Sequence, residues 1–162
     1  MSIYIFSRPI QSGKTTELQK WCNLQKNVYG ILMPDINGCR KIVDINENKI
    51  FDAECVDYID TKELLISVGR FNFYITAFEK ANLILLHALS LNPDWLVIDE
   101  IGKLELKEEG FYKSIIEAVK MYSKKNKPGN LLITVRDSLF EEVISFFNIK
   151  NFKVINSLDT IV

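Results

Sequence analysis

The stretch that decides the fold is residues 2–16, which read SIYIFSRPIQSGKTT. Residues 2–6 are short, apolar and β-prone, so we expect them to form a buried strand. A helical pattern begins at Gly13, where Leu18 and Trp21 are spaced to share one face. The chain therefore opens with a strand, a loop and a helix.

The loop between this strand and this helix follows the phosphate-binding pattern G-x-x-x-x-G-K-[ST] over residues 8–15. Such a loop wraps a polyphosphate with backbone N–H groups, and the positive end of the helix faces the same anion. Gly13 lets the backbone approach closely, Lys14 supplies a charge for the outer phosphates, and Thr15 offers a hydroxyl to Mg²⁺. The residues expected to bind the nucleotide are Arg8, Pro9, Ile10, Gln11, Ser12, Gly13, Lys14, Thr15 and Thr16.

The start of the loop departs from the pattern. Arg8 stands where the first glycine is expected, and Pro9 removes one N–H donor from the loop. Because of this departure, a second hypothesis is that the protein is a non-catalytic nucleotide-binding module with a degenerate loop.

A pair of acidic residues forms the second candidate element. Residues 95–98 read WLVI, an apolar run typical of a buried central strand in a parallel sheet, and Asp99 and Glu100 follow directly. In such sheets, ligands bind at the carboxyl ends of the strands. Asp99 is therefore expected to hold Mg²⁺ through a water molecule, and Glu100 to polarise the attacking water as a general base.

Short apolar strands alternate with longer helical segments along the chain, which predicts an α/β fold with a mostly parallel sheet flanked by helices. We expect one nucleotide-binding domain over residues 1–162, with a small β-rich insertion at about residues 35–75 that contains a hairpin. Ser138 is the expected N-cap of the last helix. The expected strands cover residues 2–6, 28–33, 40–45, 49–53, 71–75, 95–98, 131–135 and 152–155, and the expected helices cover 13–24, 76–91, 111–122 and 138–147.

The composition narrows the class of protein. Of 162 residues, 48% are hydrophobic and 25% charged, which excludes a disordered or fibrous chain. Twenty Lys and Arg residues against 21 Asp and Glu residues give a net charge of -1, which argues against a nucleic-acid partner. No apolar run is long enough to span a membrane and no signal peptide is seen, so a cytoplasmic protein without a membrane partner is expected.

Residues 99–106, DEIGKLEL, resemble the DEIGKMEL signature of the small nucleoside-triphosphatase family, known from thermophilic microbes and as the cancer-related nucleoside-triphosphatase. Residues 30–35, GILMPD, with Gly38 and Arg40 downstream, resemble a second segment of that family. Residues 68–71, VGRF, and the pair Phe78-Glu79 give further support to this resemblance.

The resemblance implies a RecA-like P-loop fold and Mg²⁺-dependent hydrolysis of ATP, GTP and other nucleoside triphosphates to the diphosphate. The family's roles, transferred to the matching positions, imply that Lys14 and Thr15 bind phosphate and metal. They also imply that Asp99 and Glu100 supply the metal and water functions.

Further charged residues are weaker candidates for the same site. Arg136 follows a predicted strand and either stabilises transition-state charge or forms a surface salt bridge. Arg40 belongs to the family-like segment described above. Lys103 and Glu105 follow the acidic pair and are expected to face solvent. The competing function is a small-molecule or nucleoside kinase whose acceptor pocket lies in the insertion.

Overall fold

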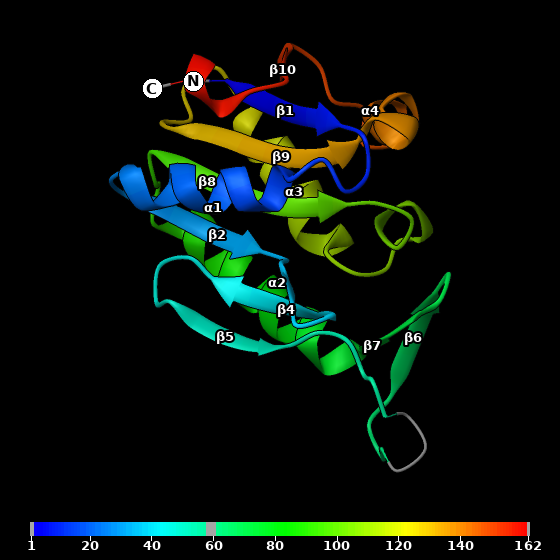
Figure 1. Ribbon diagram of the computed structural model, residues 1–162. Helices are drawn as coiled ribbons and strands as arrows, with labels where there is room; N and C mark the ends of the chain where they lie inside the picture. The colour runs from blue at the N-terminus through cyan, green and yellow to red at the C-terminus, as the bar shows by residue number, and fades with distance from the viewer. Residues whose placement is uncertain (1, 58–60, 162) are drawn as a thin grey trace.

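The computed structural model describes residues 2–57 and 61–161 and is built around an eight-stranded sheet (Figure 1). The strand order is β10-β1-β9-β8-β2-β4-β3, and β5 pairs with β4. The strands are β1 (Ile3–Arg8), β2 (Val28–Leu32), β3 (Asp35–Ile36), β4 (Cys39–Asp44), β5 (Lys49–Asp52), β6 (Leu65–Val68), β7 (Phe71–Tyr74), β8 (Trp95–Ile101), β9 (Asn130–Arg136) and β10 (Phe152–Ile155). The α-helices are α1 (Lys14–Leu24), α2 (Ile75–Ser90), α3 (Tyr112–Tyr122) and α4 (Phe140–Phe146), and the 3₁₀ helices are η1 (Glu105–Lys107), η2 (Asp137–Leu139) and η3 (Leu158–Thr160).

Five neighbouring strands, from β10 at one edge of the sheet to β2, run parallel, which confirms the predicted fold class. β1 pairs with β10 and β9, and β8 pairs with β9 and β2, all in the same direction. β2 and β8 lie very close at Gly30, where an added Cβ would stand 2.0 Å from the carbonyl oxygen of Val97. Only glycine permits this approach, which brings β2 against the strand that carries the acidic pair.

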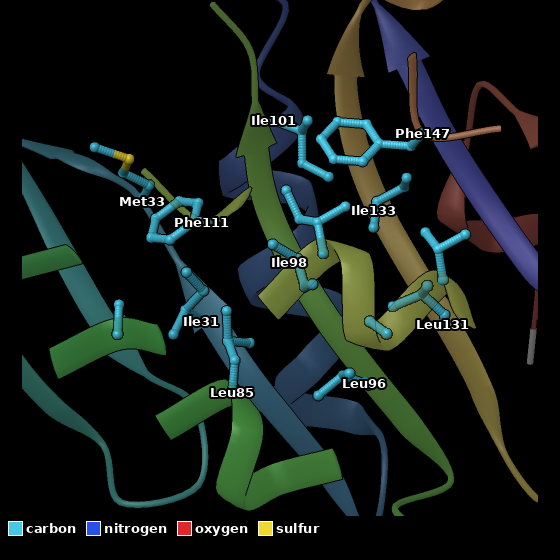
Figure 2. Packing of buried hydrophobic residues seen from close by; sticks show 14 of the residues in the cluster. Ile31, Met33, Leu85, Leu96, Ile98, Ile101, Phe111, Leu131, Ile133 and Phe147 are labelled. Carbon is cyan, nitrogen blue, oxygen red and sulfur yellow. The ribbon is translucent and has the colours of Figure 1, made fainter. Parts of the chain in front are cut away.

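Helices cover both faces of the sheet (Figure 1). α1 packs on one face through Leu18 and Trp21, where it meets Val97 of β8 and Leu132 of β9. α2 and α3 cover the other face, and their side chains join a large apolar cluster with alternate residues of the same strands (Figure 2). Because side chains alternate along a strand, every second residue after Val97 and Leu132 also lies on the α1 face.

The predicted β-rich segment lies between β2 and α2. β3, β4 and β5 extend the main sheet with antiparallel pairings, and β6 and β7 form a separate two-stranded sheet. The predicted hairpin at residues 40–53 is present as β4 and β5. β6 was not expected from the sequence, because its residues do not alternate clearly between apolar and polar.

Two boundaries differ from the prediction in ways that affect the site. β8 does not end at Ile98 but continues to Ile101, with a break in its register to β9 between these two residues. The last helix begins at Phe140 after a 3₁₀ turn, so Ser138 does not cap it. The Asp137 carboxylate instead accepts a hydrogen bond from the Ser138 backbone N–H.

Among the described residues, no helix is both long and apolar enough to cross a membrane.

Candidate functional site

The phosphate-binding loop connects the carboxyl end of β1 to the first turn of α1. Gln11 and Gly13 have φ values of 57° and 79°, in the left-handed region. No protein atom lies within 4 Å of the place where a Cβ on Gly13 would stand, so the backbone conformation rather than crowding by the protein favours glycine there. The Lys14 Nζ donates hydrogen bonds to the carbonyl oxygens of Arg8 and Pro9, at 3.0 and 2.8 Å, and so closes the loop on itself.

Arg8 fits at the first position of the pattern because it is still part of a strand. It is the last residue of β1, and its φ is not among the positive values of the described residues. Its guanidinium lies 2.6 Å from the Glu17 carboxylate on α1 and 4.7 Å from the Phe6 ring centroid. Glu17 also accepts a hydrogen bond from the backbone N–H of Leu158, at 2.9 Å. Arg8 therefore fastens the loop to α1, and Glu17 fastens α1 to the C-terminal segment.

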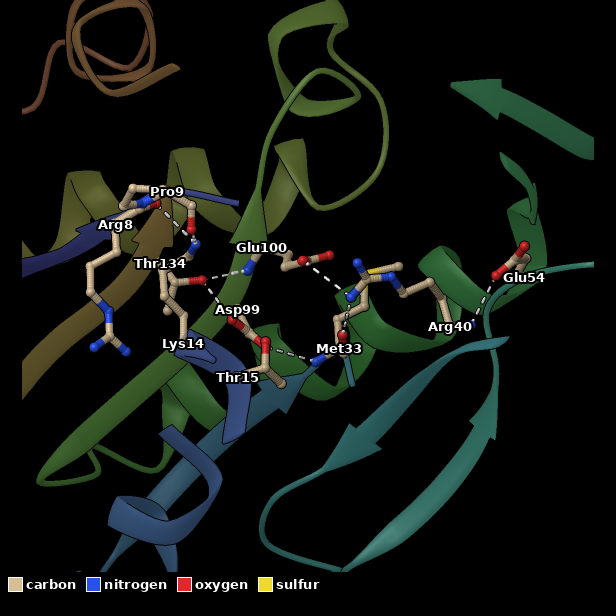
Figure 3. Close-up of polar contacts among 10 residues, drawn as sticks. All are labelled: Arg8, Pro9, Lys14, Thr15, Met33, Arg40, Glu54, Asp99, Glu100 and Thr134. Carbon is tan, nitrogen blue, oxygen red and sulfur yellow. Dashed lines mark hydrogen bonds and ion pairs between the residues drawn. The ribbon is translucent and has the colours of Figure 1, made fainter. Parts of the chain in front are cut away.

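Asp99 is fully buried beneath the first turn of α1 and links three elements (Figure 3). Its Oδ2 accepts hydrogen bonds from the Thr15 hydroxyl at 2.9 Å and from the Met33 backbone N–H at 3.0 Å. Its Oδ1 accepts a hydrogen bond from the Thr134 hydroxyl at 2.6 Å. The loop threonine and the strand aspartate, predicted from separate motifs, thus meet directly.

The register break in β8 separates the two acidic side chains. Glu100 has a φ of 61°, and its backbone N–H donates to the Thr134 hydroxyl at 2.7 Å. A bulge of this kind re-aims side chains at the edge of a sheet. Asp99 therefore points under α1, whereas Glu100 points toward β4 (Figure 3).

Thr134 is a site residue that the motif analysis missed. Its single hydroxyl donates to Asp99 and accepts from Glu100, so it fixes both acids at once. Strand alternation could have identified it, because Leu132 faces α1 and Thr134 follows two residues later at the carboxyl end of β9.

Arg40 reaches Glu100 from β4. Its Nη1 lies 3.2 Å from Glu100 Oε1 and also donates to the Met33 carbonyl oxygen at 3.2 Å. The backbone N–H of Arg40 donates to the Glu54 carboxylate at 2.9 Å, which holds this part of β4 in place. The structure thus brings a residue of the β-rich segment between β2 and α2 to the acidic pair.

A cavity of about 410 Å³ lies over the loop and extends to the β-rich segment between β2 and α2. Four cationic side chains and two carboxylates line it, an excess of positive charge that suits a polyanionic ligand. The predicted residues along it are Ile10, Gln11, Ser12, Gly13, Lys14, Thr15, Thr16, Arg40, Glu100 and Arg136, and the unpredicted ones include Asp35, Ile36, Asn48, Ile50, Arg70 and Phe71.

Some predicted residues do not line this cavity. Arg8 and Pro9 contribute their carbonyl oxygens to Lys14, and Asp99 lies below the surface. Lys103 is exposed and lines a second, smaller cavity beside the first. Arg136 lines both cavities and, within the described part of the chain, forms no ion pair.

The expectation that Glu105 faces solvent is wrong. Its side chain is buried, and its two carboxylate oxygens accept hydrogen bonds from the backbone N–H groups of Gly102 and Phe111, at 2.8 and 3.0 Å. Burial raises the pKa of Glu105 to about 7, whereas the two backbone hydrogen bonds act to lower this pKa. Glu105 thereby ties together both ends of the loop that follows the acidic pair.

Burial also shifts the pKa values of Glu100 and Lys14 beside the nucleotide-binding loop. It raises the pKa of Glu100, as does the neighbouring Asp99, while Arg40, Arg136 and Lys14 act in the opposite direction. Burial lowers the pKa of Lys14, and the carboxylates of Glu100 and Asp99 oppose this effect. Acidic and basic groups are therefore close enough to influence one another across the cavity.

The chemistry of the donor set fits Mg²⁺ shared with a phosphate. The described residues contain no group of three or more His, Cys, Asp or Glu side chains arranged to hold a metal by themselves. Thr15 and Asp99 provide one hydroxyl and one carboxylate, both hard oxygen donors, next to the phosphate-binding loop. Mg²⁺ commonly uses such a small protein contribution and completes its octahedron with water and phosphate oxygens.

The parallel sheet, the phosphate-binding loop and the acidic strand beside it define a P-loop protein of the nucleoside triphosphatase type. The sequence profile of the family described as NTPase matches residues 3–157, and the chain belongs to that family. This confirms the resemblance to the small nucleoside-triphosphatases.

The fold also has a solved counterpart. The crystal structure of THEP1 from the hyperthermophile Aquifex aeolicus superposes with a TM-score of 0.70 and 22% sequence identity, over 98% of this chain and 92% of that one. No curated protein matches the chain significantly.

Proposed function

We propose that this protein is a Mg²⁺-dependent nucleoside-triphosphatase that hydrolyses ATP, GTP and related nucleotides to the diphosphate and phosphate. The observation that carries this proposal is the hydrogen bond of 2.9 Å between Thr15 of the loop and Asp99 of β8. It joins a phosphate-binding element to a metal-binding carboxylate, and the adjacent Glu100 faces the same cavity as Lys14.

The residues of the loop would bind the phosphates in the following way. The first residues of α1 line the cavity, and the N-terminal end of a helix favours negative charge. Lys14, now bonded to two loop carbonyls, is long enough to exchange these partners for β- and γ-phosphate oxygens. Mg²⁺ held through Thr15 and Asp99 would supply the positive charge that neutralises the phosphate oxygens.

Glu100 is the proposed general base. Its carboxylate lines the cavity and stands one residue beyond Asp99, so it can accept a proton from water that attacks the γ-phosphorus. Arg40 and Arg136 line the same cavity and would stabilise the charge that develops on the transferring phosphoryl group.

The experiment is phosphate release over a panel of ATP, GTP, CTP and UTP with and without Mg²⁺, combined with nucleotide binding by calorimetry. Lys14→Ala should abolish binding, and Glu100→Gln should bind nucleotide but lose at least about 100-fold in turnover. Lys20→Ala and Glu109→Gln are the matched controls, because both side chains are exposed and neither lines the cavity. Unchanged turnover in Glu100→Gln would remove Glu100 from the mechanism, and a wild-type protein that binds no nucleotide would exclude an enzyme at this site.

A further inference from the structure

A second cavity of about 150 Å³ adjoins the nucleotide site and shares Glu100 with it. The shared border consists of Arg40, Phe71, Glu100, Gly102 and Arg136, which line both cavities. Apart from this border, the second cavity is formed mainly by apolar side chains of β6, β7, α2 and the loop after β8. The two cavities therefore meet at the proposed catalytic carboxylate.

Four phenylalanine side chains line the second cavity. Phe71 and Phe73 of β7 stack with ring centroids 5.7 Å apart. Phe73 meets Phe78 of α2 edge to face at 5.7 Å, and Phe78 meets Phe111 in the same manner at 5.0 Å. Met33 lies beside Phe111 at the same end of the core (Figure 2). These contacts fix an aromatic surface against which a planar ring can pack.

Charged side chains also line this cavity. Arg40 and Glu100 form their ion pair of 3.2 Å there, and Lys103 and Arg136 add two more cations. Glu105 also borders the cavity, but both of its carboxylate oxygens already accept backbone hydrogen bonds. Glu100 is consequently the carboxylate available to accept a proton from a ligand in this cavity.

We propose that the second cavity binds a single-ring aromatic alcohol and presents its hydroxyl to Glu100 as a phosphoryl acceptor. The size supports this class, because an apolar cavity of about 150 Å³ holds one benzene-sized ring. The aromatic side chains would hold the ring, and Glu100, which also lines the nucleotide cavity, would face the hydroxyl. This inference rests on the proposed function, since it uses the same nucleotide site and the same base.

The transfer balances without a further reactant. The hydroxyl oxygen of the alcohol forms a bond to the γ-phosphorus while the bond from that phosphorus to the β–γ bridging oxygen breaks. The bond's electron pair leaves with the nucleoside diphosphate, and the hydroxyl proton passes to Glu100. A bound alcohol would compete well with water, because it is held next to the phosphorus and its apolar ring excludes solvent from the site.

The test uses the full chain with MgATP and three probes: phenol, benzyl alcohol and 2-phenylethanol. ADP formation is followed by a coupled assay, and phosphorus NMR distinguishes a phosphomonoester from inorganic phosphate. We expect at least one probe to raise ADP formation about tenfold or more and to give a phosphomonoester signal.

Val68→Trp locates the effect, because Val68 lines only the second cavity and a larger side chain would fill it. Ser67→Trp is the matched control, because Ser67 is exposed, lies on the same strand and points to the other face. Val68→Trp should remove phosphomonoester formation and Ser67→Trp should keep it. Phosphate release without a probe reports whether each variant is folded and binds nucleotide, and Val68→Phe serves as the milder replacement if the tryptophan variant fails this check.

Two results would overturn the inference. One is the absence of a phosphomonoester with all three probes in a protein that hydrolyses ATP. The other is an unchanged product yield in a Val68→Trp protein that passes the folding check. Neither result touches the proposed hydrolysis, which is measured without a probe, whereas a wild-type protein that consumes no ATP under any condition would overturn both.

Discussion

Arg40 Nη1 and Glu100 Oε1 lie 3.2 Å apart, so a cation from the β-rich segment between β2 and α2 faces the proposed catalytic base. The two side chains are only 19% and 29% exposed, and their interaction is therefore screened less than that of a surface pair. The same guanidinium lines the nucleotide cavity. The β-rich segment between β2 and α2 is thus part of the site, although the phosphate-binding motifs lie outside it.

We predict that Arg40→Ala lowers turnover by about 10- to 100-fold, because the variant loses a cation that faces both Glu100 and the transferring phosphoryl group. Steady-state phosphate release should show a larger effect on kcat than on KM. Lys41→Ala is the control, because Lys41 is the next residue on β4 and pairs with Asp52 instead. A full rate in Arg40→Ala would mean that the ion pair has only a structural role.

Thr134→Val tests the hydroxyl that holds both acids. Valine keeps the shape of threonine but leaves the buried Asp99 oxygen and the Glu100 backbone N–H without this partner. We expect the free energy of unfolding to fall by about 1–3 kcal/mol and turnover to fall with it. Denaturant titration and phosphate release measure the two effects, and Thr134→Ser should restore both. Wild-type stability in the valine variant would show that the two hydrogen bonds contribute little.

Much of the fold was predictable because strand and helix patterns in this chain agree with the tertiary structure. The loop of residues 8–15 stands between β1 and α1 as expected, and the alternation of elements correctly gave a parallel sheet. The meeting of Thr15 and Asp99 follows from the same logic, since parallel strands bring their carboxyl ends to one edge.

Other features depend on contacts that local patterns do not contain. Glu105 looked like a solvent-facing acid because nothing in its neighbourhood signals that two backbone N–H groups would converge on it. The cavity residues Asp35 and Ile50 lie on β3 and β5, whose placement depends on the pairing of both strands with β4 and of β4 with β2. The roles assigned to all of these site residues stay predictions until they are measured.

Arg8→Gly would restore the glycine of the sequence pattern, and we predict that it destabilises the protein. The backbone of Arg8 is not in the left-handed region, so glycine would relieve no strain there. The change also removes the guanidinium that lies between Glu17 and the Phe6 ring. The greater entropy of glycine in the unfolded chain adds about 0.5–1 kcal/mol to this loss. Thermal unfolding checks the sign, and calorimetry should find no tighter nucleotide binding. A more stable Arg8→Gly protein would show that the arginine strains the loop.

Glu105 should make the stability of the fold depend on pH. Its pKa rises from an ordinary value of 4.5 to about 7 in the folded protein, with burial as the main cause. The folded state therefore holds this proton more tightly than the unfolded state does. The resulting stabilisation is fully present below pH 4.5 and is lost as the pH rises through 7.

Glu105→Gln removes this titration and isolates its contribution. Glutamine keeps one acceptor for the N–H groups of Gly102 and Phe111 but does not titrate. Its contribution to the free energy of unfolding should therefore not change with pH. The wild-type free energy of unfolding, relative to that of the variant, should fall by about 3 kcal/mol between pH 4 and pH 8. Urea titrations of both proteins at several pH values measure this difference. Glu109→Gln, an exposed acid in the same loop, controls for general charge effects. A constant difference between wild type and Glu105→Gln across this range would mean that Glu105 is ionised in the folded protein as readily as in water, and that its two backbone hydrogen bonds fully offset its burial.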